Sequence, residues 1–445
     1  MRARARPGLR RAALLLTAAA CIPAWALSLS YEDARNTLEQ VSEARRAGEA
    51  GLSRRTHDAR AADSLGLPEV STSLTQIYGR KTGTLHTPFG AVDINESLNG
   101  PRASLDTTWS IYSGGRISAA QRALAAGVEE ARAELTRTEE QLDLQLAHTY
   151  FGLDLAADVE RTRNSILQEA DRQLDRAMRF EQTGLIPKVE RLNAQVSRDE
   201  AAREQVRAQR DREIAQSRLQ RLLHSDAPVE PSTPLFVIAR PIRELREWLA
   251  LAERDNPILA AFAAKRGQAE EGIVAAQSKW KPEVFAFGTY NFIRHYQTLI
   301  EPNWVAGLGV NFTLVSRENR GSQVSAAREA LRQIQSLEAE ARNDIGTAVE
   351  SAYLKVEQAR EQFNLLDSTL SFARENLRLR ERGFEEGQAT SLEINDARNA
   401  LARAEMARSA AAFDFVVALA QLLEVSGQAR ALPEFVQQAE IQLRP

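Results

Sequence analysis

The chain has 445 residues, which is long enough for two or three ordinary domains. Charged residues make up 26 % of it and aromatic residues only 6 %, a composition that favours long helices. The formal net charge is −3 and becomes −8 without the five arginines of residues 1–11. Because the acidic residues are also spread along the chain, we expect no nucleic-acid partner.

Residues 1–26 have the composition of a secretory signal peptide. Five arginines and no acidic residue come first, an apolar stretch follows, and Ala24 and Ala26 form a small–x–small cleavage pattern. We therefore expect removal of residues 1–26. The only cysteine, Cys21, lies in this segment, so no disulfide is expected in the mature chain. Lipid attachment at Cys21 is a weaker alternative, because Ala18 stands where a larger aliphatic residue is usual.

After the signal peptide, the same order of structural signals occurs twice. Each half is predicted as strand, loop, strand, long helix, glycine-containing turn and second helix. The matched segments are 66–78 with 280–292, which share Pro-Glu-Val, then 103–116 with 304–320, and 146–159 with 349–362. The chain is therefore predicted to contain an internal duplication.

The strands are predicted from apolar residues that alternate with small or polar ones. Leu105 and Trp109 share one face of a strand whose other face carries Asp106, and Leu308 opposes Gly307 and Gly309 in the second half. A length of about ten residues with this pattern is typical of a strand that crosses a membrane around a wet interior. An ordinary half-buried sheet in a soluble domain is the alternative. Loops are predicted at roughly 79–103 and 294–303, on the side opposite the helices.

Four strands per chain are too few to close a sheet. An open sheet edge is not tolerated in lipid, because each unpaired backbone group costs several kcal/mol. Two copies would give eight strands around a filled interior, whereas three would give twelve strands and a lumen. Beyond the signal peptide no run of about 18 apolar residues occurs, so no transmembrane helix is expected.

The two long helices are predicted from stretches with few helix breakers. Residues 116–181 and 322–383 contain no proline and few glycines, and each would span roughly 90–100 Å. Their apolar residues form narrow stripes, for example Val128, Leu135 and Leu142, which resemble a coiled-coil seam. Narrow seams on otherwise charged helices suit the wall of a tube.

The turns that follow these helices repeat after 203 residues. When Gly184 is aligned with Gly387, Glu190 falls on Glu393 and Asn193 on Asp396. Together with the Pro-Glu-Val segments and the sequences YSGGR and ENRG where strand meets helix, these turns resemble the outer-membrane efflux protein (TolC) family. The resemblance covers essentially the whole chain after the signal peptide.

This resemblance implies an α+β membrane protein that forms a homotrimer in the outer membrane of a Gram-negative bacterium. Its 12-stranded β-barrel, with four strands per chain and two internal repeats, would continue into a long α-helical periplasmic barrel. The implied function is the passive exit duct of a tripartite efflux pump or a type I secretion system. The implied partners are outer-membrane lipid, a periplasmic adaptor and an inner-membrane transporter of RND, ABC or MFS type; no cofactor is implied.

The predicted segments are a signal peptide (1–26), N-terminal periplasmic or equatorial helices (27–66), β-hairpin 1 (67–115), helical hairpin 1 (116–223), an inter-repeat equatorial region (224–279), β-hairpin 2 (280–316), helical hairpin 2 (317–426) and a C-terminal tail (427–445). An equatorial collar is expected from 27–66, 223–273 and the tail.

In the family, the helix–helix turns form the periplasmic tip, where the tunnel narrows and the adaptor docks. The resemblance therefore implies docking at turns built on Gly184, Gly387, Glu190 and Asn193. Glu393 and Asp396 match acidic residues that line the entrance, and six carboxylates in a trimer would favour cations. The alternative is that both are solvated acids in the first turn of a helix, where the dipole favours them.

Two residues depart from the family pattern at this entrance. Phe384 stands where a tyrosine often joins the network that holds the gate closed, and Ala389 stands where an arginine can occur. A closing contact in this chain must then be apolar or lie elsewhere.

The sequence offers no catalytic or metal-binding motif. The five histidines are scattered, and no phosphate-binding loop or nucleophile elbow is present. We therefore expect no enzyme. The alternative function is a periplasmic adaptor or coiled-coil structural protein that does not span a membrane, but it leaves the paired ten-residue strands unexplained.

Overall fold

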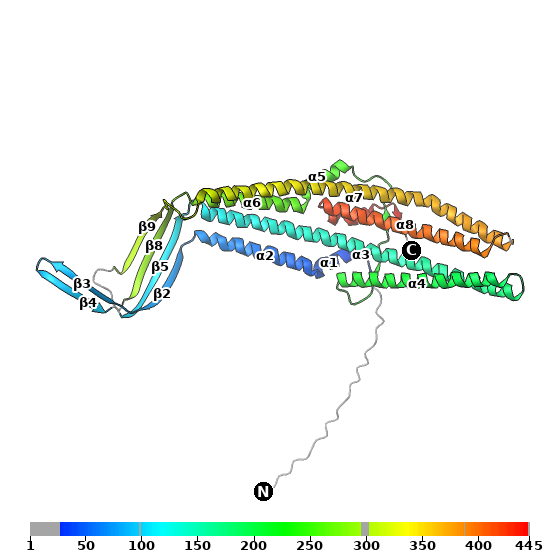
Figure 1. The fold of residues 1–445 in the computed structure, drawn as a ribbon, viewed down its shortest axis with the longest axis horizontal. Helices are drawn as coiled ribbons and strands as arrows, with labels where there is room; N and C mark the ends of the chain where they lie inside the picture. Colours follow the sequence, from blue (N-terminus) through cyan, green and yellow to red (C-terminus); the bar gives the residue numbers. More distant parts are fainter. Residues whose placement is uncertain (1–26, 98, 295–301, 387, 444–445) are drawn as a thin grey trace, which may run out of the picture.

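The computed structural model describes residues 27–97, 99–294, 302–386 and 388–443 and forms one elongated body (Figure 1). A β-sheet lies at one end and two helix–helix turns lie at the other. The predicted signal peptide with Cys21, most of the predicted loop 294–303 and Gly387 fall outside the described residues.

Four antiparallel strands form the main sheet in the order β2-β5-β8-β9. Their bounds are Glu69–Ile77 (β2), Gly100–Tyr112 (β5), Glu283–Arg294 (β8) and Trp304–Asn311 (β9). The two halves of the chain meet at the β5–β8 pair, where Leu105 lies opposite Tyr290. The strands β2 and β9 are therefore the two edges of the sheet.

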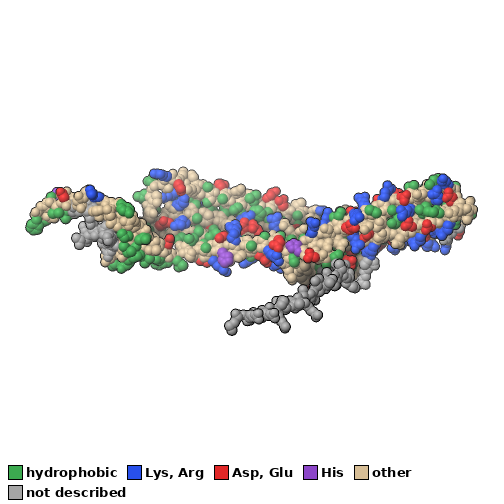
Figure 2. Space-filling model, turned by 90° about the horizontal axis from the view of Figure 1, so that it is seen from below, with side chains coloured by type: hydrophobic (Ala, Val, Ile, Leu, Met, Phe, Trp, Pro, Cys, Tyr) green, Lys and Arg blue, Asp and Glu red, His purple; other side chains and the backbone are tan. Residues whose placement is uncertain are grey.

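The alternation predicted from the sequence separates the two faces of this sheet. On one face, the exposed side chains are mainly large and apolar, including Val70, Leu74, Leu105, Trp109, Tyr290, Trp304, Leu308 and Val310. On the other face, Asp106 accepts hydrogen bonds from Ser104 at 2.7 Å and Thr289 at 2.9 Å. Figure 2 shows hydrophobic side chains gathered on the sheet, whereas charges of both signs concentrate toward the helical tip.

Two glycines of β9 are required by aromatic rings of β8. The ring of Phe285 lies over Gly309, where an added Cβ would be only 2.4 Å from it, and Phe287 lies over Gly307 at 3.0 Å. Because neighbouring strands are in direct register here, any larger residue would push the rings away. The small residues in this strand therefore serve packing within the sheet.

The predicted loop at 79–103 is wrong in one respect: it contains two further strands. Strands β3 (Arg80–Thr87) and β4 (Gly90–Ser97) pair with each other in an antiparallel hairpin beyond the main sheet (Figure 1). Strand β5 also begins at Gly100, earlier than expected. Strand β3 is rich in Thr and carries one large apolar residue, Leu85, and the apolar alternation of β4 is limited to Val92 and Ile94, which explains why alternation did not reveal these strands.

The helices are α1 (Tyr31–Val41), α2 (Glu43–Asp63), α3 (Arg116–Gln182), α4 (Lys188–Leu222), α5 (Leu245–Asp255), α6 (Pro257–Ser278), α7 (Arg320–Glu385), α8 (Ser391–Val425) and α9 (Leu432–Gln437), with 3₁₀ turns η1 (Ser64–Gly66) and η2 (Ala429–Ala431). Helices α3 and α7 have 67 and 66 residues, so each is about 100 Å long.

The helices form a layer that runs from the sheet to the tip (Figure 1). Helices α2 and α4 lie end to end beside α3, and α6 and α8 lie end to end between α3 and α7 (Figure 1). Thus α2 and α6, from segments expected to build a collar, run along the long helices instead. We call α3–α4 the first helical hairpin and α7–α8 the second.

The main hydrophobic core lies halfway along the helices. Rings of Tyr31, Tyr150, Phe151, Phe236 and Phe415 contact one another in sequence and are almost completely buried. The Tyr150 hydroxyl donates to the carbonyl of Leu29 at 2.7 Å and accepts from two backbone amides of residues 232–233. Two pairs of short strands pack against this core. Strand β1 (Leu27–Leu29) pairs with β6 (Val229–Pro231), and β7 (Phe236–Val237) pairs with β10 (Ile441–Gln442).

Helix α8 is long and apolar enough to cross a membrane by composition alone. Its apolar residues are instead used in the core, because Phe415, Val416, Leu419 and Leu422 are fully buried against other parts of the chain. The apolar character of α8 thus reflects packing inside the protein.

Candidate functional site

The first helix–helix turn ends α3 with a left-handed glycine. Gly184 has φ 73°, and its N–H donates to the carbonyl of Glu181 at 3.0 Å. The next N–H, that of Leu185, reaches back to the carbonyl of Phe180 at 2.8 Å. This pair of bonds is the Schellman arrangement, in which the left-handed residue carries no steric penalty when it is glycine.

The second turn repeats one of these bonds at the aligned position. The N–H of Gln388 donates to the carbonyl of Gly383 at 2.7 Å, 203 residues after the bond between Leu185 and Phe180. Gly387 itself lies outside the described residues. The backbone on both sides of Gly387 therefore makes the same hydrogen bond that closes the first turn.

The two turns differ in the residue that begins the second helix. Pro187 precedes α4 and makes no side-chain cap, whereas Thr390 precedes α8 and forms a capping box with Glu393. The Thr390 hydroxyl accepts from the Glu393 N–H at 3.3 Å, and the Glu393 carboxylate accepts from the Thr390 N–H at 2.8 Å. Pro187 has no N–H, so the equivalent Glu190 lacks this donor.

The carboxylate of Glu393 is also held by a cation. Its Oε1 accepts from Arg380 of α7 at 2.7 Å. The backbone N–H of Thr390 lowers the pKa of Glu393, with smaller contributions from the Thr390 hydroxyl and from Arg380. The Glu393 carboxylate is therefore ionised, and its oxygens already accept hydrogen bonds from Thr390 and Arg380 of the same chain.

Asp396 is more available than Glu393. It lies one turn further along α8, its side chain is exposed, and it makes no hydrogen bond or ion pair with the residues described here. Phe384 is half-buried in the last turn of α7. The structure thus places Glu393, Asp396 and Phe384 around one turn, where Glu393 is bonded to Thr390 and Arg380.

The equivalent residues of the first turn are arranged differently. Glu190 is half-buried in the first turn of α4, and Asn193 is exposed. Arg191 and Glu181 form an ion pair across the turn at 2.5 Å. At the aligned positions, the second repeat has Phe384 in place of Glu181 and Ile394 in place of Arg191.

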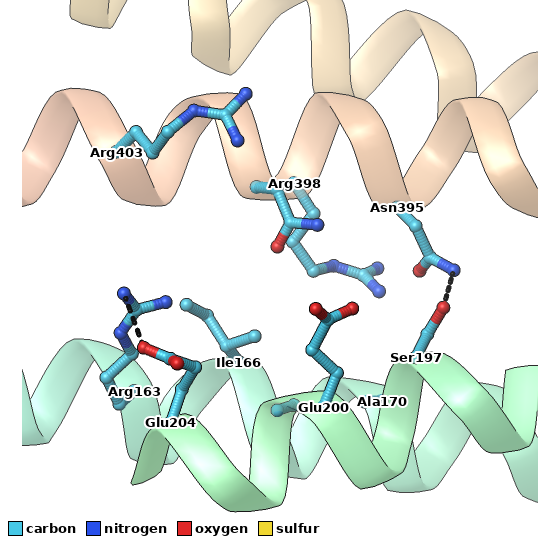
Figure 3. A pocket seen from close by; sticks show the side chains of 11 residues that line it. Arg163, Ile166, Ala170, Ser197, Glu200, Glu204, Asn395, Arg398 and Arg403 are labelled. Atoms are coloured by element: carbon cyan, nitrogen blue, oxygen red, sulfur yellow. Dashed lines mark hydrogen bonds and ion pairs between the residues drawn. The ribbon is translucent and has the colours of Figure 1, made fainter. Parts of the chain in front are cut away.

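A polar groove lies between the two helical hairpins near the tip, and sequence reasoning missed it (Figure 3). It has a volume of about 280 Å³ and is lined by side chains from α3, α4 and α8. Arg398 of α8 points toward the first hairpin, with Glu200 facing it across the groove (Figure 3). Asn395 donates to Ser197 at 3.2 Å, and Arg163 pairs with Glu204 at 3.3 Å.

The tip therefore offers charges and hydrogen-bonding groups for non-covalent contacts. Within the described ranges, no group of three or more His, Cys, Asp or Glu side chains could hold a metal ion. The signal for the groove in the sequence is Arg398, a charged residue next to Ala397 and one turn from Ile394 and Ala402 of α8, and its partners lie too far away in the chain to be identified.

The structure is similar to several solved outer-membrane channels. It matches the CmeC outer membrane channel of Campylobacter jejuni with a TM-score of 0.76 and 12% identity, over 92% of this chain and 90% of that one. It matches the outer membrane protein VceC of Vibrio cholerae with a TM-score of 0.75 and 14% identity, over 89% and 96%. The open state of the Neisseria gonorrhoeae MtrE outer membrane channel gives 0.72 and 16% identity, over 90% and 89%.

The sequence itself matches the family model described as outer membrane efflux protein over residues 36–224 and 248–428. These two matched regions cover most of the chain and correspond to the two repeats. A comparison with curated proteins gives no significant match. The chain therefore belongs to the outer membrane efflux protein family: it is a channel of the outer membrane, and its helices extend into the periplasm.

Proposed function

We propose that three copies of this chain form one exit duct, with a 12-stranded barrel in the outer membrane and a helical tunnel in the periplasm. The observation that carries this proposal is the pair of open edges on the four-stranded sheet. Strands β2 and β9 each lack a neighbour on one side among the described residues. Because one face of the sheet is apolar, we place this sheet in lipid with that face outward. In lipid the two edges must be paired with the edges of other copies.

The helices support the same head-to-tail assembly. Helix α2 leads into β2, and β9 leads into α7, so each sheet edge continues into one side of the helical layer (Figure 1). On α7, Leu365, Phe372 and Leu379 are exposed at intervals of seven, and on α4 Val189 and Val196 are exposed at the same interval. Such unpartnered seams fit a heterologous contact that closes into a ring.

The tip is the proposed gate and docking site. Since Glu393 is paired within its chain, Asp396 is the carboxylate that contributes most to the charge of the constriction. Three copies of Asp396 around one axis would favour cations and bind divalent ions. Phe384, half-buried beside them, provides the apolar part of the narrowing.

The turns also provide a surface for a periplasmic adaptor. Leu185, which follows Gly184 and precedes the turn of α4 that carries Glu190, is a large apolar residue exposed at the very end of the first hairpin. Asn193 adds a hydrogen-bonding group on the same helix, and the turn around Gly387 is the counterpart in the second repeat. An adaptor bound here would connect the duct to an inner-membrane transporter of RND, ABC or MFS type, for efflux or type I secretion.

The assembly is tested by purification from membranes. We expect an outer-membrane species that requires detergent, has the mass of three chains by light scattering, and changes mobility on heating before electrophoresis. Release of a monomer by osmotic shock would contradict the proposal and would favour the alternative, a periplasmic adaptor that does not span a membrane.

A further inference from the structure

We propose that the inner face of the barrel carries a binding site for aromatic organic cations, formed by Phe285, Phe287 and Asp106 of each chain. This inference rests on the proposed trimeric duct, in which the face of the sheet opposite the apolar one is the wall of the lumen. The site lies in the sheet, at the other end of the molecule from the helix–helix turns of the tip (Figure 1).

Two phenylalanines of β8 lie on the polar face of the sheet. Phe287 lies opposite Thr108 of β5, and Phe285 lies opposite Ser110, so both rings share the face of Asp106. The lumen side of a membrane-spanning strand is ordinarily polar, whereas its apolar side chains face lipid. The two rings therefore depart from the pattern of their own face.

Strand β9 leaves room for these rings. Gly309 lies opposite Phe285 and Gly307 opposite Phe287, and the Cζ end of each ring occupies the space that a β-carbon on the glycine would fill. The ring centroids are 6.2 Å apart, with 43° between the ring planes. Phe287 remains 39 % exposed, and Phe285 is half-buried. The two rings thus form one aromatic surface on the inner face, and part of it is open to the lumen.

Carboxylates lie on the same face as the rings. Asp106 lies opposite Thr289 across the β5–β8 pair, which places it one diagonal step, roughly 7–8 Å, from Phe287. Its oxygens accept hydrogen bonds from Ser104 at 2.7 Å and from Thr289 at 2.9 Å, and these bonds hold the carboxylate in place. Glu69 of β2 is exposed on the same face.

The basic groups near this face lie toward its two ends. Arg102 lies four residues before Asp106 on β5, near the hairpin β3–β4, and donates to Asn291 at 3.2 and 3.3 Å. At the helical end, Arg116 of α3 pairs with Glu283 at 3.1 Å. The part of the wall that carries the rings therefore has acidic neighbours.

This combination of groups suits a cation that carries an aromatic ring. The face of a phenylalanine attracts a positive charge, and a nearby carboxylate adds to this attraction, whereas an anion is repelled by both. Two adjacent rings also provide a surface for burial of a planar apolar group. In the proposed trimer, β2 with Glu69 pairs with β9 of the next chain, so the rings lie between carboxylates of two chains. A small, strongly hydrated cation would gain only from the carboxylates.

The test compares three ions as blockers of single-channel current through the full-length protein in planar bilayers. Benzyltrimethylammonium has a ring and a positive charge, tetramethylammonium has the charge alone, and benzenesulfonate has the ring with a negative charge. In wild type, half-block by benzyltrimethylammonium is expected at a concentration about tenfold below that of tetramethylammonium, because only the former can contact the rings. Benzenesulfonate is not expected to block.

Substitutions identify the residues responsible. Phe287→Leu keeps an apolar side chain without a ring and should bring the half-block concentrations of the two cations to within about twofold of each other. Phe287→Tyr keeps the ring and should retain the difference, and Asp106→Asn should weaken block by both cations. The matched control is Tyr290→Leu, because Tyr290 is an exposed aromatic residue of the same strand on the opposite face; it should leave the block unchanged.

The outcomes separate this site from the duct itself. Loss of the difference in Phe287→Leu, together with its retention in Phe287→Tyr and Tyr290→Leu, supports the site. If wild type conducts but does not distinguish the two cations, or if the difference persists in Phe287→Leu as it would for block at the tip, the rings serve only to pack against β9 and the proposed duct stands. Phe285→Leu replaces Phe287→Leu, with the same expectation, if the latter does not assemble. If wild type forms neither trimers nor channels, the proposed duct is wrong.

Discussion

Pro187 and Thr390 are the residues that begin the second helix of each hairpin, and only Thr390 forms a capping box there. The duplicated turn thus presents different side chains in the two repeats. In the first repeat it ends in an exposed apolar surface, and in the second it ends in a carboxylate held by backbone and cation. This difference determines which acidic residues are available at the tip.

The capping box predicts a local loss of stability on substitution. Thr390→Ala removes the hydroxyl that accepts from the Glu393 N–H, and such caps contribute about 1 kcal/mol. We expect faster hydrogen exchange in the first turn of α8, measured by mass spectrometry. Thr347→Ala is the control, because that hydroxyl bonds only to a carbonyl inside α7; equal exchange in both variants would contradict the role of the cap.

The pairing of Glu393 predicts unequal effects of the two tip acids on ion selectivity. Asp396→Asn should reduce cation preference and divalent block more than Glu393→Gln, because the charge of Glu393 is largely compensated by Arg380. The double variant should lose both properties. Reversal potentials in a salt gradient measure this, with Glu375→Gln as the control for an exposed acid paired within α7. Unchanged currents in the double variant would dismiss the acidic ring.

A buried carboxyl predicts that mild acid stabilises the protein. Glu140 of α3 is 6 % exposed and accepts from the Ala429 N–H at 2.7 Å. Burial raises its pKa to about 7, and Asp143 and Glu424 add to the shift, while the Ala429 N–H and Arg430 oppose it. Because the folded pKa exceeds the unfolded one, the protonated form favours folding. The stabilisation is complete below the unfolded pKa and is lost as the pH rises through 7.

The measurement is the melting temperature in detergent between pH 5 and pH 8. Wild type should melt a few degrees higher at the acidic end, and Glu140→Gln should flatten this dependence, since a neutral amide oxygen still accepts from Ala429. Glu129→Gln, which removes an exposed acid paired within α3, should leave the slope unchanged. An unaltered slope in Glu140→Gln would assign the pH dependence to other groups.

The close approach of Phe285 to Gly309 predicts a specific defect in the barrel. Gly309→Ala places a Cβ against the ring, and overpacking of this kind costs roughly 1–3 kcal/mol. We expect less heat-modifiable trimer on electrophoresis. Combining it with Phe285→Leu should restore assembly, whereas Gly83→Ala, which meets no atom within 4 Å, should have no effect. Failure of the double variant to recover would mean that Gly309 is needed for another reason.

The sequence was most informative for structural features that depend only on residues close together along the chain. Alternation of two residues placed Leu105 and Asp106 on opposite faces of one strand, and the turn around Gly184 was recognised from a glycine that its backbone requires. The hairpin β3–β4 was missed because β3 has one large apolar residue, Leu85, and the alternation of β4 is limited to Val92 and Ile94, and because its strands pair only with each other.

By itself, the sequence determined the repeated order of strands and long helices, because a period of two or of three to four residues is a local property of the backbone. Only the tertiary structure decided which distant groups meet. Arg398 and Gln173 are 225 residues apart, and Glu140 reaches Ala429 across 289. Such pairs depend on how α3, α7 and α8 pack side by side. The sequence of one helix does not show which charged residues of the other helices will lie next to it.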